Sequence, residues 1–400
     1  MSENNINFYE NNLFIFKGHA CNCAIDTNNI APNLPPETTL KIQSNHEHNI
    51  VFAFAPTDGL VRLGNKGAII EKNLLGKLIE IKNGDMDSLI KFFERNGFLF
   101  NVSDSSYEAI NTNKIFELIK RLRVTVDLIS SIGEIKKDYE KIFGLTLYLL
   151  LSQPIEFNIS TIPKPYKTCL HSFLTKYDQA KTYPQPDYYI QQIYSDECIL
   201  IEDSLYPPIY KFDMNLYLPV TEGHGDEHYL SGSSCDLYIN IALLYAHGIN
   251  ELPSIRQTVE LIFHYLNDVG VIKDVKADGS IEYYEKPKLN KITLEMKKRI
   301  IDIAKIVIGE EINANMSDVH PFYDSKTMSP SWNIDSLLGG LYFSIFYMKP
   351  DLELFRRCRH CGSFFQVRST STRKVYCSDE CRNRYQQAMH RKRKREKEEN

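Results

Sequence analysis

The sequence of 400 residues lacks a long hydrophobic run. Its longest apolar stretches lie around 145–151 and 337–348, well below the roughly 18 residues that a helix needs to cross a bilayer. The first twelve residues are mostly polar, without the basic start and apolar core of a signal peptide. We therefore expect no membrane contact and a cytoplasmic protein.

Motifs of the commonest enzyme classes are also missing. The chain has no glycine-rich phosphate loop, no G-x-S-x-G nucleophile elbow and no dinucleotide-binding fingerprint. Because many enzymes carry none of these motifs, their absence is weak evidence against catalysis. Whether the chain is an enzyme stays open, and the balance is against it.

Charge is small in total but unevenly distributed. The net charge is −4, yet residues 356–395 contain thirteen Lys or Arg and only two acidic residues. Residues 1–355 carry a net charge of −13, since the last five residues contribute −2. An acidic body with a basic end suggests that the basic end contacts nucleic acid. The alternative is that the basic end folds back on its own body.

Four cysteines near the end of the chain have the spacing of a metal site. Cys358 and Cys361 form a C-x2-C pair, and Cys377 and Cys381 form a C-x3-C pair, with fifteen residues between the two pairs. Two short spacings of this kind let four sulfur atoms surround one ion. We predict one structural Zn²⁺, because four cysteine ligands leave no open position for water. The alternative is four unrelated buried cysteines.

The residues around each cysteine pair predict their local structure. Gly362 suits a tight knuckle after the first pair, and residues 364–367 suit a strand, with 373–376 as its expected hairpin partner. Ser378 suits an N-cap, followed by Asp379 and Glu380 at the positive end of a helix. A knuckle, a hairpin and a helix that carries the second pair are the layout of a treble-clef finger.

This stretch resembles a known family of fingers. The strings Cys358-x2-Cys361-Gly362-x2-Phe365 and Tyr376-Cys377-Ser378-x2-Cys381-x-Asn383-Arg384 are similar to the CGNR-type zinc finger of bacterial proteins, although Arg382 stands where that family has glycine. The resemblance implies transcription regulation. The whole chain also resembles an uncharacterised bacterial family, a domain of unknown function that ends in such a finger.

The helix after the second cysteine pair is strongly basic. On a helix, Arg384, Arg391 and Arg395 fall close to one stripe, which can enter the major groove or follow the phosphates. Nucleic acid, most simply duplex DNA, is therefore the expected partner; RNA or protein binding, or a purely structural finger, are the alternatives. The candidate contacts are Arg382, Arg384, Arg391, Lys392, Arg393 and Arg395.

The pattern along the chain predicts an α+β protein in four consecutive segments. Residues 1–152 are expected to form a mixed α/β N-terminal unit, with short strands at 13–17 and 50–54 and helices from residue 85 onward. A Pro- and Tyr-rich connection at 153–220 leads to a mainly helical region at 221–350. The finger and its basic helix follow at 351–400.

The third segment is expected to contain a hairpin, a helix and a buried apolar stretch. A helix is expected at 293–308, ended by Gly309, and a hairpin around Asp278-Gly279. Residues 334–347 are apolar on nearly every side and should be buried. The helix at 113–132 in the first segment has one apolar stripe.

Three other clusters hold metal-ligand residue types. Cys21 and Cys23, or His46 and His48, would share one face of a strand. The loop 222–228 contains His224, Asp226 and His228, the raw material of a metal or acid–base site. The first two clusters have no matching second pair nearby and the third lies in a glycine-containing loop, so an ordinary polar surface or core is the favoured interpretation of each.

Two functions follow from these observations. The first is a DNA-binding regulator whose acidic body senses a small-molecule effector or a protein partner. The second is an enzyme, or an accessory factor of defence or mobile elements. Its finger would only target the protein to nucleic acid or stabilise the fold. Convergence of His224, Asp226 and His228 in a concave site would favour the second.

Overall fold

The computed structural model describes residues 14–28, 37–55, 58–64, 67–180, 200–201, 203–206, 210–211, 237–238, 240–242, 244–245, 252–325, 328–348, 353–362, 364–368 and 374–398. Helices and antiparallel sheets occur together, which confirms the predicted α+β class. The chain divides into two compact units, neither of which is one continuous segment. Unit 1 draws on Met1–Gly133, Ile155–Cys169 and Glu311–Asn400, and unit 2 on Glu134–Pro154 and Leu170–Glu310.

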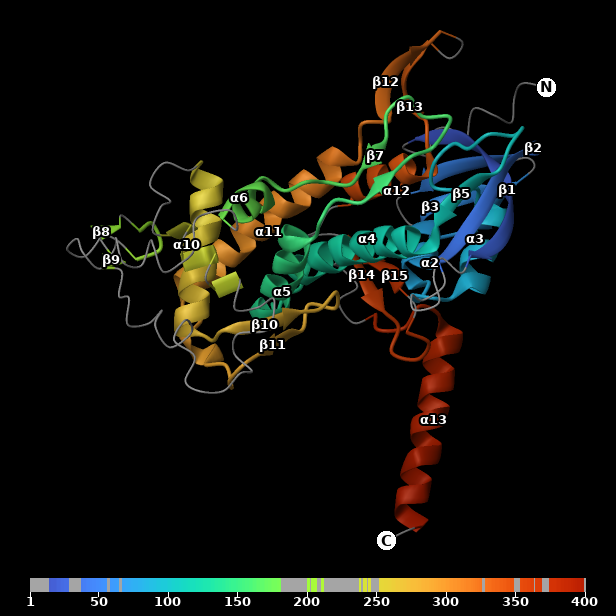
Figure 1. Ribbon diagram of the computed structural model, residues 1–400. Coiled ribbons are helices and arrows are strands. Elements are labelled where there is room, and N and C mark those ends of the chain that lie inside the picture. The colour runs from blue at the N-terminus through green and yellow to red at the C-terminus, as the bar shows by residue number, and fades with distance from the viewer. Residues whose placement is uncertain are drawn as a thin grey trace. The chain divides into compact units, whose positions relative to one another are not determined.

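A five-stranded antiparallel sheet forms the core of unit 1 (Figure 1). Its strands are β1 (Ile15–Asn28), β2 (Glu37–Ala55), β3 (Gly59–Leu63), β4 (Ile69–Glu71) and β5 (Glu108–Asn111). β2 pairs with β1 along one edge, while β3 and β5 share its other edge and β4 extends the sheet from β3. The long strand β2 therefore pairs directly with every other strand of the sheet except β4.

β1 and β2 are longer than the sequence pattern predicts. Leu40, Ile42 and Ser44 are buried, while Lys41 and Gln43 between them are partly exposed. This alternation is typical of a strand with one face toward the core. The short apolar runs of the sequence mark only the ends of these strands, because the polar face contributes half of each strand's residues.

Four helices of unit 1 accompany the sheet. They are α2 (Leu74–Glu80), α3 (Met86–Asn96), α4 (Thr112–Gly133) and α12 (Leu337–Phe346). The Asp85 side chain accepts a hydrogen bond from the Ser88 N–H, so Asp85 is the N-cap of α3. The predicted apolar stripe of α4 is confirmed, since Ile115, Leu118, Ile119, Leu122, Val126 and Ile129 are all buried.

Helix α12 packs directly on the sheet. The ring of Phe343 lies 4.7 Å from that of Phe14, centroid to centroid. Gly340 faces Phe16 so closely that a Cβ there would lie 2.3 Å from the ring, and only glycine permits this approach. Residues 337–345 are buried, as the apolar sequence predicts.

Short strand pairs and the last helix complete unit 1. β6 pairs with β7, β12 with β13 and β14 with β15, each pair antiparallel. Their bounds are β6 (Glu156–Phe157), β7 (Tyr166–Lys167), β12 (Val319–Asp324), β13 (Ser329–Ile334), β14 (Glu353–Arg357) and β15 (Phe364–Arg368), and helix α13 (Asp379–Glu398) follows.

Unit 2 is mainly helical. Its elements are α5 (Tyr139–Leu151), α6 (Ser172–Ala180), β8 (Leu200–Ile201), β9 (Tyr210–Lys211), α10 (Pro253–Asp268), β10 (Ile272–Val275), β11 (Ile281–Tyr283), a 3-10 turn η4 (Leu289–Lys291) and most of α11 (Leu294–Ala314). The predicted hairpin is confirmed: β10 pairs with β11 and Gly279, at φ +84°, donates its N–H to Lys276 O.

The prediction that Gly309 ends a helix is wrong. α11 continues past Gly309 to Ala314, although glycine in a helix interior costs about 0.5–1 kcal/mol. The extra turn carries Glu311, which forms a buried ion pair with Arg121 of α4 inside unit 1. A contact between residues 190 apart thus outweighs the local preference of glycine.

Candidate metal centre and the helix that follows it

The four cysteines of the predicted metal site converge at one end of the β14–β15 hairpin. Cys358 and Cys361 lie in the turn between β14 and β15, and Cys377 and Cys381 lie at the start of α13. All four sulfur atoms are within 4.8 Å of one another. The four residues are therefore close enough to hold one metal ion.

The sulfur spacing suits tetrahedral coordination. Cys377 Sγ lies 3.4 Å from Cys381 Sγ and 3.6 Å from Cys361 Sγ. Four sulfurs at about 2.3 Å from a common ion are ~3.8 Å apart in a regular tetrahedron. The site therefore needs only small adjustments to accept an ion.

Backbone geometry at the first pair is that of a knuckle. Gly362 adopts φ +75°, a left-handed conformation that favours glycine. Its N–H donates to Cys358 O at 2.8 Å, which closes the turn. Burial alone would raise the pKa of the Cys358 thiol, but backbone N–H groups of Cys361, Cys377 and His360 outweigh it and lower the pKa to about 6. The turn thus favours a thiolate at Cys358.

The pKa of the Cys377 thiol is shifted in the opposite direction, upward, because the thiol is partly buried and close to the other three sulfurs. Burial raises the pKa of this thiol, the neighbouring thiols of Cys381, Cys361 and Cys358 raise it further, and it reaches about 12. Several thiolates in so small a volume repel each other. A cation among the four sulfurs would offset this repulsion, and the sulfurs are close enough to hold one.

The second pair is held by a helix cap. Ser378 Oγ accepts a hydrogen bond from the Cys381 N–H, and Arg382 N–H donates to Ser378 O. This confirms Ser378 as the N-cap of α13, with Asp379 and Glu380 in the first turn. The cap fixes Cys377 and Cys381 one turn apart on the same side of the helix.

The hairpin partner of β15 differs from the prediction. Residues 364–368 do form a strand, but it pairs with β14, which precedes the knuckle. Lys374 to Tyr376 form no strand; they approach the knuckle through the Arg359 N–H, which donates to Val375 O at 3.1 Å. The sequence prediction missed β14 because Glu353–Arg357 is too polar to show an apolar strand pattern.

The finger is anchored on the rest of unit 1. Asn73, the N-cap of α2, donates through Nδ2 to Phe364 O at 3.0 Å, and Glu80 at the end of α2 accepts from the Phe364 N–H at 2.5 Å. The Phe355 N–H donates to Ser130 Oγ of α4 at 3.2 Å. The hairpin therefore shares hydrogen bonds with two helices of the body.

Packing inside the finger is small and centred on the cysteines. Cys358, Phe365 and Val367 form a buried cluster against which Tyr376, Cys377 and Cys381 pack. Tyr385 of α13 lies 5.4 Å from Tyr376, ring centroid to ring centroid, so it joins the finger. So few apolar side chains bury too little surface to hold the finger in place by packing alone.

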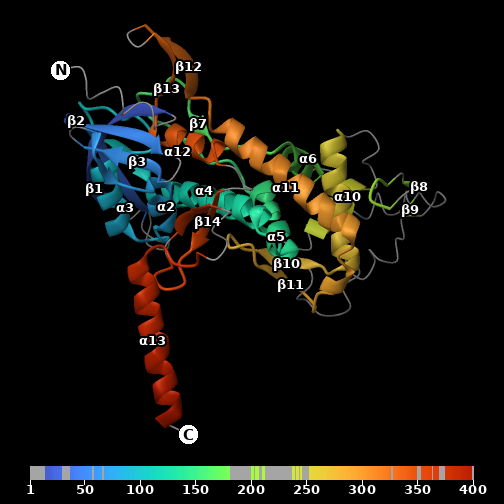
Figure 2. The same cartoon turned by 180° about the vertical axis from the view of Figure 1, so that it is seen from behind.

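α13 presents the candidate nucleic-acid contacts. It is 20 residues and about 30 Å long, and in both views its C-terminal half lies apart from the sheet and helices of unit 1 (Figure 2). Arg382 and Arg384 are exposed and pair with Asp379 and Glu380, one turn earlier. Arg391 is exposed too. Lys392, Arg393 and Arg395 lie in the same helix, but their side chains are outside the described part of the structure.

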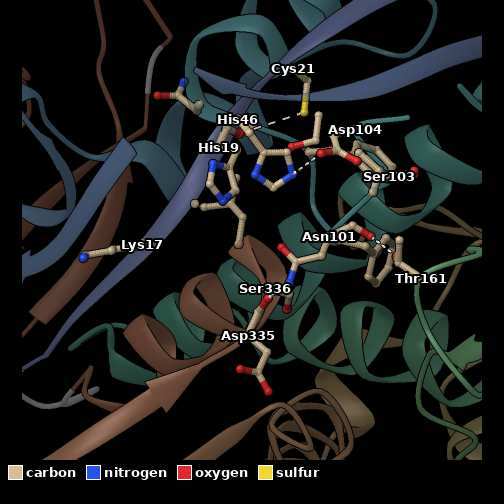
Figure 3. Close-up of a pocket in the computed structure, with 18 of the residues that line it drawn as sticks. Lys17, His19, Cys21, His46, Asn101, Ser103, Asp104, Thr161, Asp335 and Ser336 are labelled. Carbon is tan, nitrogen blue, oxygen red and sulfur yellow. Dashed lines mark hydrogen bonds and ion pairs between the residues drawn. The ribbon is translucent and has the colours of Figure 1, made fainter. Parts of the chain in front are cut away.

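The other predicted clusters have different outcomes. Strand alternation does not join Cys21 to Cys23 or His46 to His48 in a metal site. Instead the β1–β2 register shifts between His19, which pairs with Asn49, and Ala20, which pairs with Asn45. The His19 and His46 rings lie 4.1 Å apart beside this shift (Figure 3). Burial raises the pKa of Cys21 to about 11, so this thiol is neutral. Among the described residues, this region brings no three ligand atoms within 4.8 Å of one another. His224, Asp226 and His228 lie outside the described residues.

Comparison of the chain with family models, with curated proteins and with solved structures gave no match. In the part of the chain that the structure describes, no helix combines the length and apolar character that a bilayer crossing requires.

Proposed function

We propose that the C-terminal region is a structural zinc finger that presents α13 to duplex DNA, and that the protein is a DNA-binding regulator. The observation that carries this proposal is that the cysteine cluster leads directly into a basic helix. The last metal ligand, Cys381, lies in the first turn of α13, and the residues from 382 to 395 include seven Lys or Arg and no acid. A metal at the cysteines therefore fixes the start of a long basic helix.

Zinc is the metal that the ligand set favours. Four thiolates in a tetrahedral arrangement are typical of structural Zn²⁺ sites, which have no open coordination position. In this role the ion stabilises the finger and does no chemistry. A freshly purified protein should hold one zinc per chain, and a much smaller zinc content would contradict the assignment.

Exposure and charge support the contact with phosphates. The ion pairs of Arg382 and Arg384 are exposed, and such pairs contribute little energy, so both guanidinium groups are available to a stronger anion. Each phosphate neutralised releases counterions from DNA, which makes the affinity salt-dependent. The acidic body does not attract DNA, so binding should depend on this helix.

The test is the salt dependence of duplex binding by the full-length, zinc-loaded protein. In the variant, four cations of α13 become glutamine: Arg391, Lys392, Arg393 and Arg395. In the matched control, four exposed lysines elsewhere become glutamine: Lys82, Lys91, Lys276 and Lys286. The α13 variant should lower the slope of log K against log salt by about 0.9 for each phosphate that the helix no longer neutralises, up to about 4.

Equal slopes for the variant, the control and the parent would contradict the proposal. Selection of genomic fragments at about 150–200 mM salt then separates a sequence-reading regulator, which enriches a few sites, from a nonspecific binder. Preferential recovery of RNA would move the function away from duplex DNA.

A second candidate is favoured by the anchoring of the finger. Asn73, Glu80 and Ser130 form hydrogen bonds with the backbone of the hairpin. The finger therefore also suits a purely structural role in an enzyme or accessory factor. In that case the parent protein binds duplex DNA no better than the α13 variant. Loss of zinc would then affect stability alone.

A further inference from the structure

The part of α13 between Cys381 and Arg391 has two different faces. Cys381, Tyr385 and Met389 follow one another at a spacing of four residues and are partly buried, and Tyr385 packs on Tyr376. The remaining residues of this part are exposed. The inner face joins the helix to the finger through Cys381 and Tyr385, so the outer face is open to a partner.

The centre of the outer face is a stripe of amide and imidazole side chains. Asn383, Gln386, Gln387 and His390 have the spacing i, i+3, i+4 and i+7, which places them on one face of an α-helix, away from Tyr385. All four are exposed. From the first to the last of them the helix rises about 10 Å, which is close to three base-pair steps of about 3.4 Å.

Arginines border this stripe on both sides. Because an α-helix turns by about 100° per residue, Arg382 lies on one side of the stripe, and Arg384 and Arg391 lie on the other. All three are exposed. A helix in the major groove meets base edges in front of it and a phosphate backbone on either side. The order of cation, amide and cation across the outer face matches this surrounding.

The first turn of α13 limits where such a contact can begin. Asp379 and Glu380 are exposed and form ion pairs with Arg382 and Arg384. Their carboxylates would repel phosphates, so DNA can approach the helix only beyond them. The stripe from Asn383 onward lies entirely within the part of the helix that DNA can approach.

The chemistry of a carboxamide distinguishes base edges from phosphates. A phosphate oxygen accepts hydrogen bonds and donates none, so it satisfies only the NH₂ half of an asparagine or glutamine side chain. Adenine presents its N7 acceptor and N6–H₂ donor side by side in the major groove, and a carboxamide pairs with both. Amides at the centre of the outer face are therefore suited to adenine.

We propose that Asn383, Gln386 and Gln387 read base edges in the major groove and select adenine within a core of about three base pairs. The arginines on either side hold the helix on the phosphates of the two strands and carry no sequence information. This inference rests on the proposed function, and it adds which residues determine the sequence that is bound.

The test is a selection from duplexes with a randomised segment by the full-length, zinc-loaded protein at about 150–200 mM salt. The parent should enrich a core that contains adenine. Asn383→Ala with Gln387→Ala should lower the affinity for the selected duplex at least ~10-fold. The same double variant should keep the affinity for unselected duplex, its salt slope and the zinc content, because no phosphate or metal contact is lost. Asn113→Ala, at an exposed position of α4, is the matched control and should bind like the parent.

Two further variants separate base reading from positioning. Gln387→Arg should shift the enriched base from adenine to guanine, because arginine pairs with guanine O6 and N7. Arg391→Gln should weaken binding to all sequences alike and lower the salt slope by about one unit. A purely structural role of Gln387 would produce no change of base.

The proposal is overturned if the parent binds duplex DNA in a salt-dependent way but enriches no sequence; the contact of α13 with DNA then stands as a nonspecific one. It is also overturned if the double variant or Gln387→Arg enriches the same sequence as the parent. If the parent binds no duplex at any salt concentration, the proposed function fails together with this inference.

Discussion

Arg121 and Glu311 form a buried ion pair in unit 1. Arg121 Nε lies 2.9 Å and 3.1 Å from the two carboxylate oxygens, and its Nη2 donates to Cys169 O at 2.7 Å. Their side chains are 3% and 0% exposed. A buried pair of this kind is costly to break, because the remaining charge has no water around it.

Glu311→Gln should therefore destabilise the protein by about 3–5 kcal/mol, measured by urea unfolding. Replacing both residues by apolar ones, Arg121→Met with Glu311→Leu, should recover most of the loss. The matched control is Glu295→Gln, an exposed glutamate in the first turn of the same helix, with an effect within about 0.5 kcal/mol. Equal effects of Glu311→Gln and Glu295→Gln would show that the pair contributes nothing.

Asp203 is the acceptor of a buried network in unit 2. Its carboxylate accepts from the Leu205 and Tyr206 N–H groups and from Tyr245 Oη, and His264 Nε2 lies 2.6 Å from Oδ2. Burial alone would raise the pKa of Asp203, but these hydrogen bonds lower it to about 2. The carboxylate is thus stabilised by the fold.

A folded-state pKa below the ordinary value makes stability depend on pH. The contribution of Asp203 is present above its unfolded pKa of about 4 and is lost as the pH falls through about 2. Unfolding free energies measured between pH 2 and pH 6 should fall more steeply toward acid in the parent than in Asp203→Asn. Asp274→Asn, at an exposed position of β10, should keep the parent slope; if Asp203→Asn keeps it too, the network does not govern acid stability.

At the scale of elements, Gly362 and Gly309 have opposite roles, although both have room for a Cβ atom. A Cβ added at Gly362 or at Gly309 would meet no atom within 4 Å, but only Gly362 has a positive φ, +75°. Gly362 lies in the knuckle and Gly309 inside α11. Backbone conformation alone therefore distinguishes them.

Gly362→Ala should destabilise the finger by about 1–2 kcal/mol and weaken metal binding about 5- to 30-fold, measured by competition with a chromophoric chelator. Gly309→Ala should stabilise the protein by about 0.5–1 kcal/mol, because alanine suits a helix interior better, and should leave metal affinity unchanged. Unchanged metal affinity in Gly362→Ala would contradict the knuckle geometry.

Helix α13 is attached to the finger at its N-terminal end. Cys381 lies in its first turn and Cys377 just before it, while Tyr385 packs on Tyr376 of the finger. Beyond Arg391 the sequence offers charge and no apolar side chain. This half of the helix therefore has little to bury and is suited to contact a charged partner, as the glutamine variants of α13 test.

At the scale of the whole molecule, the finger and the body of unit 1 should be coupled. Removal of the metal by a strong chelator should speed hydrogen exchange in β14 and β15 and also in α2, whose Asn73 and Glu80 bind Phe364. α5 and α10 belong to unit 2 and should exchange at unchanged rates. If α2 does not respond, the finger is an independent module.

The cysteine cluster and the main helices could be predicted from the sequence because they depend on neighbours along the chain. Two short cysteine spacings, an N-cap serine and an apolar repeat of 3.6 residues act over a few residues each. The α+β class and the stripe of α4 are confirmed for this reason. These local interactions also determined the start of α13 at Ser378.

Only the tertiary structure decided which distant segments meet. β15 pairs with the polar strand β14, α11 runs through Gly309 to place Glu311 at Arg121, and His19 meets His46 where the β1–β2 register shifts. Such contacts depend on long-range packing free energy, which no pattern of adjacent residues encodes. By itself the sequence determined which four cysteines lie close enough to hold a metal ion, because their short spacings act locally, and the folded chain decided which helices that cluster is attached to.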